Sequence, residues 1–285
     1  MHFLILAMLA STSILICFKI FDKLKVDTIT AITVNYLVGA TLGFMSLTRV
    51  EGMMISRAPW FFIAILMGFI LIAGFILFAI STRQAGIAIT SISSRVSVIF
   101  SVLLGIFVFS DSMGIVKIAG FVLAIVALIL IFSREKNSKI SPATIYIPLL
   151  VFILSGMNDS TLKIAQHYYM KSTQVDYISF AATSFFWAFI LSVPLIIYHF
   201  ISKRLGINLK SVIAGIILGT LNWASIYLML NGLSVMEVSL FFPILNIGVV
   251  TMATVTGYYI FKEKLRMINV IGIATAVVAI VLITY

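Results

Sequence analysis

The sequence has little charge, one cysteine and few histidines. Only 10% of its 285 residues are charged, and it contains one cysteine and three histidines. A single cysteine excludes an internal disulfide, and so few metal-binding side chains argue against a metal centre. The zinc-binding His-Glu-x-x-His, the nucleophile turn Gly-x-Ser-x-Gly, the phosphate loop and the dinucleotide fingerprint are all absent. We therefore predict that the protein is not an enzyme and has no cofactor.

Apolar residues dominate instead, at 62% of the chain. Even a soluble domain of about 300 residues buries only about 75% of its surface, so it could not hide this much apolar area. We predict an all-α integral membrane protein, multi-pass in the plasma or inner membrane of the cell. With roughly 20 residues per crossing, ten transmembrane helices are expected at 2–18, 28–47, 59–80, 86–108, 113–132, 145–165, 175–199, 211–231, 236–260 and 267–284.

The net charge of +10 lies mostly in the connections between these spans. There lysine and arginine face lipid head groups, so membrane lipids are the expected partners and nucleic acid is not. The most polar stretch, near Ser133 to Pro142, separates two halves. We expect a first five-helix repeat at 1–133, a polar linker at 134–144 and a second five-helix repeat at 145–285.

Two groups of residues recur in both halves. Gly105, Phe109-Ser-Asp111 and Gly120 recur at one offset as Gly257, Phe261-Lys-Glu263 and Gly272, and Val26-Asp27-Thr-Ile29-Thr30 recurs as Val175-Asp176-Tyr-Ile178-Ser179. Since five spans is an odd number, consecutive copies enter the membrane from opposite faces. The result is an inverted repeat, which is typical of secondary transporters with a binding site near the membrane midplane.

A longer motif, Gly232-Leu-Ser-Val-Met-Glu-Val-Ser-Leu-Phe-Phe-Pro243, leads into the ninth span, and Ala85-Gly-Ile-Ala-Ile-Thr-Ser91 is its first-half counterpart. With the repeated glycines and turns, the chain resembles the drug/metabolite transporter superfamily and, within it, the EamA-like ten-helix transporters. The resemblance implies a ten-helix transporter of small molecules with both termini in the cytoplasm. The lysine and arginine count of the connections favours both termini outside, so both orientations stay open.

Arg95 is the most informative single residue. It lies in Ser93-Ser94-Arg95, about nine residues into the fourth span and so roughly 13 Å from the nearer interface. Charged groups at that depth are costly and commonly mark a substrate pathway. We predict that Arg95 contacts the substrate, with a structural ion pair or a later start of the span as the alternatives.

Other polar or aromatic residues also lie mid-span. We predict a central cavity formed largely by the fourth, sixth, eighth and ninth spans, lined by Arg95, Asn222, Trp223, Tyr227 and Asn246. Pro243 is expected to break the ninth helix and free backbone carbonyls, as discontinuous transporter helices do, although a packing kink is the alternative.

Asp159, Lys163 and Glu237 are three further charged residues for which the sequence leaves two interpretations open. Asp159 and Lys163 are spaced to form an ion pair along one helix. Alternatively, Asp159 takes up a proton during transport or neutralises Arg95 in the empty state. Glu237, at the start of the ninth span, either caps and orients helices or lines the pathway.

Together these features predict a secondary transporter that moves a small polar or amphipathic metabolite by alternating access, as an exporter or exchanger. Its partners would be the small-molecule substrate, membrane lipids and a coupling partner, either a proton or a counter-substrate. The alternatives are a translocator of a lipid or lipid-linked substrate, and a membrane-embedded enzyme that uses Asp159 with Ser155 or Ser160.

Overall fold

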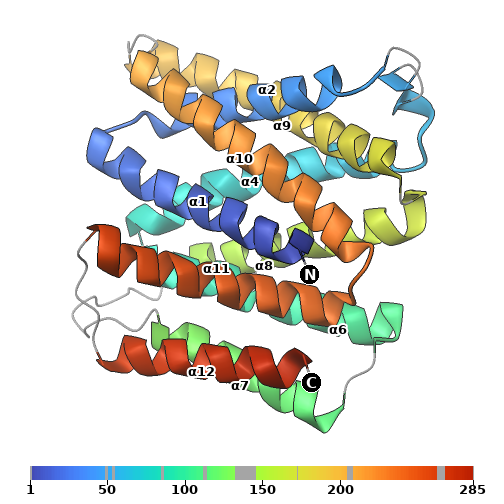
Figure 1. The fold of residues 1–285 in the computed structure, drawn as a ribbon. Coiled ribbons are helices and arrows are strands. Elements are labelled where there is room, and N and C mark those ends of the chain that lie inside the picture. The colour runs from blue at the N-terminus through green and yellow to red at the C-terminus, as the bar shows by residue number, and fades with distance from the viewer. Residues whose placement is uncertain are drawn as a thin grey trace. The chain divides into compact units, whose positions relative to one another are not determined.

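The computed structural model describes residues 2–48, 51–52, 55–84, 87–111, 114–131, 146–171, 173–203, 208–261 and 267–284. Throughout these ranges the regular structure is helical, with no strand (Figure 1). The predicted linker at 134–144 and the turn containing Glu263 lie outside the described residues.

The described α-helices range from 10 to 30 residues in length. They are α1 (His2–Leu24), α2 (Thr28–Met45), α4 (Phe61–Gln84), α5 (Ile87–Val96), α6 (Val98–Phe109), α7 (Ile115–Ile131), α8 (Tyr146–Ile164), α9 (Gln174–Lys203), α10 (Leu209–Leu233), α11 (Val238–Phe261) and α12 (Met267–Thr284), with a short 3-10 helix η1 (Ile55–Arg57) and a π-helical turn η3 (Ala165–Tyr169).

Within the described part of the chain, ten apolar helical segments lie where the sequence predicts ten spans. Six are long and apolar enough to cross a membrane, and four shorter ones cover 2–18, 93–109, 115–130 and 267–283. Many large apolar side chains on them are exposed, for example Phe107 at 81% and Ile115 at 87%, as expected for surfaces that contact lipid. This pattern indicates a multi-pass membrane protein.

The fourth predicted span, 86–108, is matched by two consecutive helices, α5 and α6, which meet at Ser97. The backbone of Ser97 stays in the right-handed helical region, so the irregularity is local. The Ser97 hydroxyl donates a 2.6 Å hydrogen bond to the carbonyl of Ser94, one turn earlier. Serine side chains that bond to nearby carbonyls compete with the helix backbone, which explains an irregularity at this polar point.

Contacts divide the chain into two compact units. Unit 1 contains Met1–Ile72 and Thr161–Ser234, and unit 2 contains Ala73–Ser160 and Val235–Tyr285. Each unit therefore combines helices from both halves of the sequence. This grouping concerns contacts and not ancestry, so the two five-helix repeats stay a prediction.

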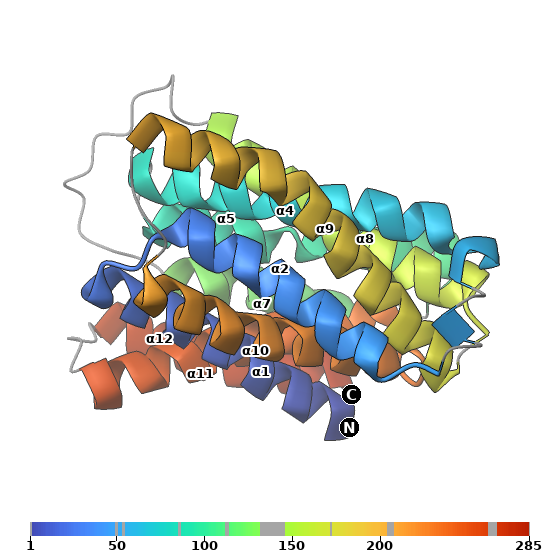
Figure 2. The same cartoon turned by 90° about the horizontal axis from the view of Figure 1, so that it is seen from above.

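Unit 1 is organised around α2, which packs against α9 and α10, while α1 also packs on α10 (Figures 1 and 2). Two glycines make the close approach possible. A Cβ on Gly219 would lie 2.6 Å from the backbone oxygen of Asn35 on α2, and one on Gly39 would lie 2.8 Å from the ring of Phe185 on α9. Small residues thus let these helices meet within one chain, as membrane helices commonly do.

Unit 2 pairs α7 with α12 and α6 with α11. Figure 1 shows α12 alongside α7. Gly120 faces Ile283 at this contact, where an added Cβ would lie 2.9 Å from the Ile283 side chain. Asp111, just after α6, accepts a 3.0 Å hydrogen bond from the backbone N–H of Ser239 and so satisfies one donor at the start of α11. The repeated turn therefore has a structural role in joining α6 to α11.

Candidate functional site

Arg95 and Asn246 form the central contact of the candidate site in unit 2. Nη1 of Arg95, on α5, donates a 2.7 Å hydrogen bond to Oδ1 of Asn246, on α11. Each residue lies eight positions after the first residue of its helix, which is about 12 Å along the axis. Two polar residues at this depth in apolar helices therefore meet each other, and Asn246 is only 4% exposed.

The contact leaves hydrogen-bond donors without acceptors. Among the described residues, Nδ2 of Asn246 is buried and has no partner. Arginine carries five N–H donors in a planar fork, and the bond to Asn246 uses one of them. Since Oδ1 of Asn246 accepts from Arg95, its NH2 group is left pointing elsewhere. The pair thus offers several donors and a positive charge, which together suit an anion.

Asp159 is a carboxylate on α8, close to the contact of that helix with α5. Its Oδ1 accepts a 3.1 Å hydrogen bond from Asn158. One turn earlier on the same helix face, the hydroxyl of Ser155 hydrogen-bonds to that of Ser94 at 3.0 Å. Because Ser94 precedes Arg95, this bond holds the polar part of α5 against the polar face of α8.

In unit 1 a buried amide pair joins α2 to α10. Nδ2 of Asn222 donates a 3.2 Å hydrogen bond to Oδ1 of Asn35. Asn222 is 7% exposed, and Asn35 is fully buried with its own Nδ2 unpaired among the described residues. A buried amide with an unmet donor is costly in an apolar helix bundle. Asn222, which the sequence predicts as a polar residue in mid-span, therefore has a buried polar partner in Asn35.

Trp223 and Tyr227, also in unit 1, form a stacked pair on α10. Their rings are nearly parallel, at 2°, with centroids 5.6 Å apart. The Tyr227 hydroxyl donates to Oε1 of Gln174 on α9, whose Nε2 donates a 2.8 Å hydrogen bond to Asn231. The side chain of Asn231 in turn donates to the carbonyl of Tyr227. Tyr227 is therefore held in place by a closed set of polar contacts, and Trp223 stacks on its ring.

Lys163 is buried in unit 1, at 8% exposure. Its Nζ donates hydrogen bonds of 3.0 Å to Oε1 of Gln166 and 2.9 Å to the carbonyl of Leu233. Leu233 is the last residue of α10, so a cation here complements the negative end of that helix. The predicted pair of Lys163 with Asp159 stays a prediction.

Glu237 and Pro243 lie at the start of α11. Glu237 forms an ion pair with Lys117 on α7, at 3.4 Å, and its carbonyl accepts the backbone N–H of Phe241. These contacts are those of a residue that orients a helix start. α11 continues through Pro243, whose ring nitrogen has no hydrogen to donate to the carbonyl one turn earlier.

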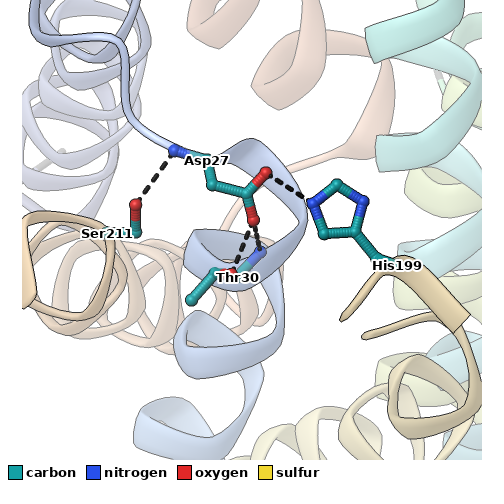
Figure 3. A network of polar contacts seen from close by, with 4 residues as sticks. All are labelled: Asp27, Thr30, His199 and Ser211. Carbon is teal, nitrogen blue, oxygen red and sulfur yellow. Dashed lines mark hydrogen bonds and ion pairs between the residues drawn. The ribbon is translucent and has the colours of Figure 1, made fainter. Parts of the chain in front are cut away.

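A further polar network in unit 1 surrounds Asp27, the N-cap of α2 (Figure 3). Its carboxylate accepts hydrogen bonds from the backbone N–H and the hydroxyl of Thr30, at 2.9 and 2.6 Å, and lies 2.9 Å from Nε2 of His199 on α9. The backbone N–H of Asp27 donates to the hydroxyl of Ser211 on α10. Partial burial raises the pKa of Asp27, but the bonds from Thr30 and the charge of His199 outweigh it, so the net pKa is lowered.

Sequence reasoning did not single out Asn35, Gln174, Asn231 or His199. Asn35 had a usable signal, since it is a lone amide inside an apolar span, as Asn222 is. Gln174, Asn231 and His199 lie near helix ends, where polar residues are ordinary. Only the packing of α2 and α10 against α9 shows that they have specific partners.

Comparison with known proteins supports the predicted resemblance. Residues 1–133 match the EamA-like transporter family. A protein of Haemophilus influenzae (strain ATCC 51907 / DSM 11121 / KW20 / Rd), described as uncharacterized, is 28% identical over 294 aligned positions, which cover 100% of this chain and 98% of the relative. A solved crystal structure has a TM-score of 0.81 at 13% identity, over 99% of this chain and 95% of the other.

The family match confirms the resemblance to the EamA-like transporters over residues 1–133. By its description, that family consists of transporters. The likeness to the solved structure shows a shared fold and nothing more, because the identity is low.

Proposed function

We propose that the protein is a secondary transporter of a small organic anion, which binds at Arg95 and Asn246 and crosses the membrane by alternating access. The observation that carries this proposal is the 2.7 Å bond between the two residues, deep in apolar helices, with the amide N–H donors of Asn246 buried and unpaired. A positive charge at such depth is costly unless a partner compensates it. A transported anion would be such a partner.

The geometry favours a carboxylate or a phosphate group. A guanidinium fork engages two oxygens of either group through parallel hydrogen bonds, and charge-assisted bonds of this kind are stronger than neutral ones. The Asn246 amide, held by Arg95, could donate a further bond to the same oxygens. No nucleotide hydrolysis is expected, because the sequence contains no phosphate loop.

Separately, we propose that Asn222, Trp223 and Tyr227 form a substrate-contacting surface within unit 1. The stacked rings offer a flat apolar surface with a polar edge, which suits an amphipathic metabolite. The indole N–H of Trp223 is buried and unpaired among the described residues, so it too could serve a polar group of the substrate.

An exchange experiment without a chosen substrate tests the proposal. Proteoliposomes containing the purified protein are loaded with a uniformly labelled metabolite extract and diluted into the same extract without label. Mass spectrometry then identifies which labelled compounds leave. Small carboxylates or phosphates should exchange faster than from protein-free liposomes, without added nucleotide. Exchange confined to cations or neutral compounds, or no exchange above the protein-free rate, would contradict the proposal.

A further inference from the structure

Asp159 has a feature that the anion site alone does not explain. It lies one turn after Ser155 on α8, and the hydroxyl of Ser155 hydrogen-bonds at 3.0 Å to that of Ser94, the residue before Arg95. This carboxylate therefore lies at the contact of α5 with α8, beside the proposed anion site. It is not Arg95's hydrogen-bond partner, because the described bond of Arg95 goes to Asn246. A second negative group beside an anion site opposes binding by its charge. The arrangement therefore needs a way to remove that charge when the substrate arrives.

We propose that Asp159 is the coupling-proton site, so that one proton binds to its carboxylate whenever an anion binds at Arg95. This inference rests on the proposed function. In the empty site Arg95 carries one positive and Asp159 one negative charge. A bound monoanion adds one negative charge, and a proton from water on the open side forms an O–H bond on Asp159 and restores neutrality. On release the anion and the proton both return to water.

The groups around Asp159 are consistent with an exchangeable proton. Asn158 donates a hydrogen bond to one carboxylate oxygen of Asp159, and Arg95 lies on the part of α5 that contacts α8 beside it. Lys163 lies one turn later on α8, and its Nζ donates hydrogen bonds to Gln166 and to the carbonyl of Leu233. Three other described charged residues of unit 2 lie at the start of α11 and have partners there. Asp111 accepts a hydrogen bond from the backbone N–H of Ser239, and Lys117 pairs with Glu237.

Neutrality also has an energetic reason. Charges interact more strongly in an apolar surrounding than in water, so an unbalanced charge at membrane depth would hinder movement of the loaded site. A carboxylate that switches between an ion partner of Arg95 and a neutral acid keeps both the empty and the loaded site uncharged. Proton and anion would then move in the same direction.

Two variants imitate the loaded site without any substrate. Arg95→Gln removes the positive charge, and Asn246→Asp places a competing carboxylate on Arg95 at almost unchanged shape. In both, Asp159 should be protonated at neutral pH. Infrared spectroscopy of the purified proteins detects the C=O stretching band of a protonated carboxyl group. Each variant is compared with its double variant carrying Asp159→Asn, and the wild type with Asp159→Asn alone.

The expected result is a band in Arg95→Gln and in Asn246→Asp that the added Asp159→Asn removes, with no such difference in the wild type. If one variant fails to fold, the other still decides. A band that Asp159→Asn leaves unchanged in a folded background would overturn the inference, while anion exchange by the wild type would still support the proposed function.

A transport readout is independent of the spectra. Proteoliposomes with an alkaline interior are placed in the labelled extract, and the amount of labelled anion that accumulates inside is measured. This amount is divided by the amount of anion exchanged when the pH is equal on both sides. The ratio should fall at least several-fold in Asp159→Asn. Glu51→Gln, which alters a carboxylate bound to Thr48 in the 45–55 connection, is the control and should keep the wild-type ratio. An unchanged ratio in Asp159→Asn would overturn the coupling role.

Discussion

Arg95 and Asn246 are 151 residues apart in the sequence and are joined by a 2.7 Å hydrogen bond. Each occupies the same position relative to the start of its helix, eight residues in, on α5 and α11. An amide that accepts from the guanidinium is oriented by it, and its own NH2 group is thereby fixed as a donor. The bond explains why Asn246 should matter for binding although it carries no charge.

Asn246 should therefore influence affinity for the transported anion. We expect Asn246→Ala to weaken apparent affinity about tenfold, which corresponds to about 1.4 kcal/mol, because a donor and the orientation of Arg95 are lost. Asn246→Asp should weaken it further, since the new carboxylate competes for the guanidinium. The concentration dependence of exchange in proteoliposomes measures both. Equal affinity of wild type and Asn246→Asp would contradict this role.

The amide pair of α2 and α10 should couple the two helices. We expect Asn35→Ala and Asn222→Ala each to lower thermal stability in detergent, and the double variant to lose less than the sum. Hydrogen bonds between membrane helices commonly contribute about 0.6 kcal/mol in such cycles. Strict additivity of the two substitutions would show that the 3.2 Å bond contributes nothing.

The sequence predicts many of these helices and site residues, but it does not predict all of the contacts between them. Apolar run length predicted the ten helical segments, and depth along a helix singled out Arg95, Asn222 and Asn246. The Arg95 to Asn246 contact did not follow from run length, because a hydrogen bond depends on helix rotation and on which helices are neighbours. The local irregularity at Ser97 did not follow from it either, since it arises from a local hydroxyl bond that competes with the helix.

The glycine contacts of α10 predict a sharp difference between two similar substitutions. Gly219→Ala would place Cβ 2.6 Å from the backbone oxygen of Asn35, which cannot move aside without shifting α2. We expect a loss of about 1–3 kcal/mol. Gly74→Ala on α4 meets nothing within 4 Å and should be neutral or stabilising by up to about 1 kcal/mol. Thermal unfolding in detergent compares them, and equal effects would contradict the described packing.

The network around Asp27 predicts a pH-dependent contribution to stability (Figure 3). Because the folded-state pKa of Asp27 is lowered, its contribution is present above the unfolded value of about 3.9. It is lost as the pH falls through the lower folded value. Asp27→Asn keeps a capping oxygen but removes the charge that strengthens the bonds from Thr30 and attracts His199, so it should cost about 1 kcal/mol at pH 7. The difference from wild type should shrink below about pH 4.

The matched control for Asp27 is Thr30→Val, which removes the hydroxyl bond and keeps the carboxylate, the backbone bond and the contact with His199. Its melting temperature should fall less than that of Asp27→Asn, and its pH dependence should follow the wild type. If the stability of Asp27→Asn stays below that of the wild type by the same amount from pH 7 to pH 3, the charge of the carboxylate is not the source of the lost stability.

The most direct test of the central claim is the exchange of labelled anions by Arg95 variants. Arg95→Lys keeps the charge but loses the fork, and Arg95→Ala loses both. Arg57→Ala, at an exposed arginine of η1, is the control for loss of an arginine elsewhere. For proteins inserted in equal amount, we predict rates in the order wild type, Arg95→Lys, Arg95→Ala, with Arg57→Ala equal to wild type. Near-equal exchange by wild type and both Arg95 variants would contradict the assignment of the anion site to Arg95.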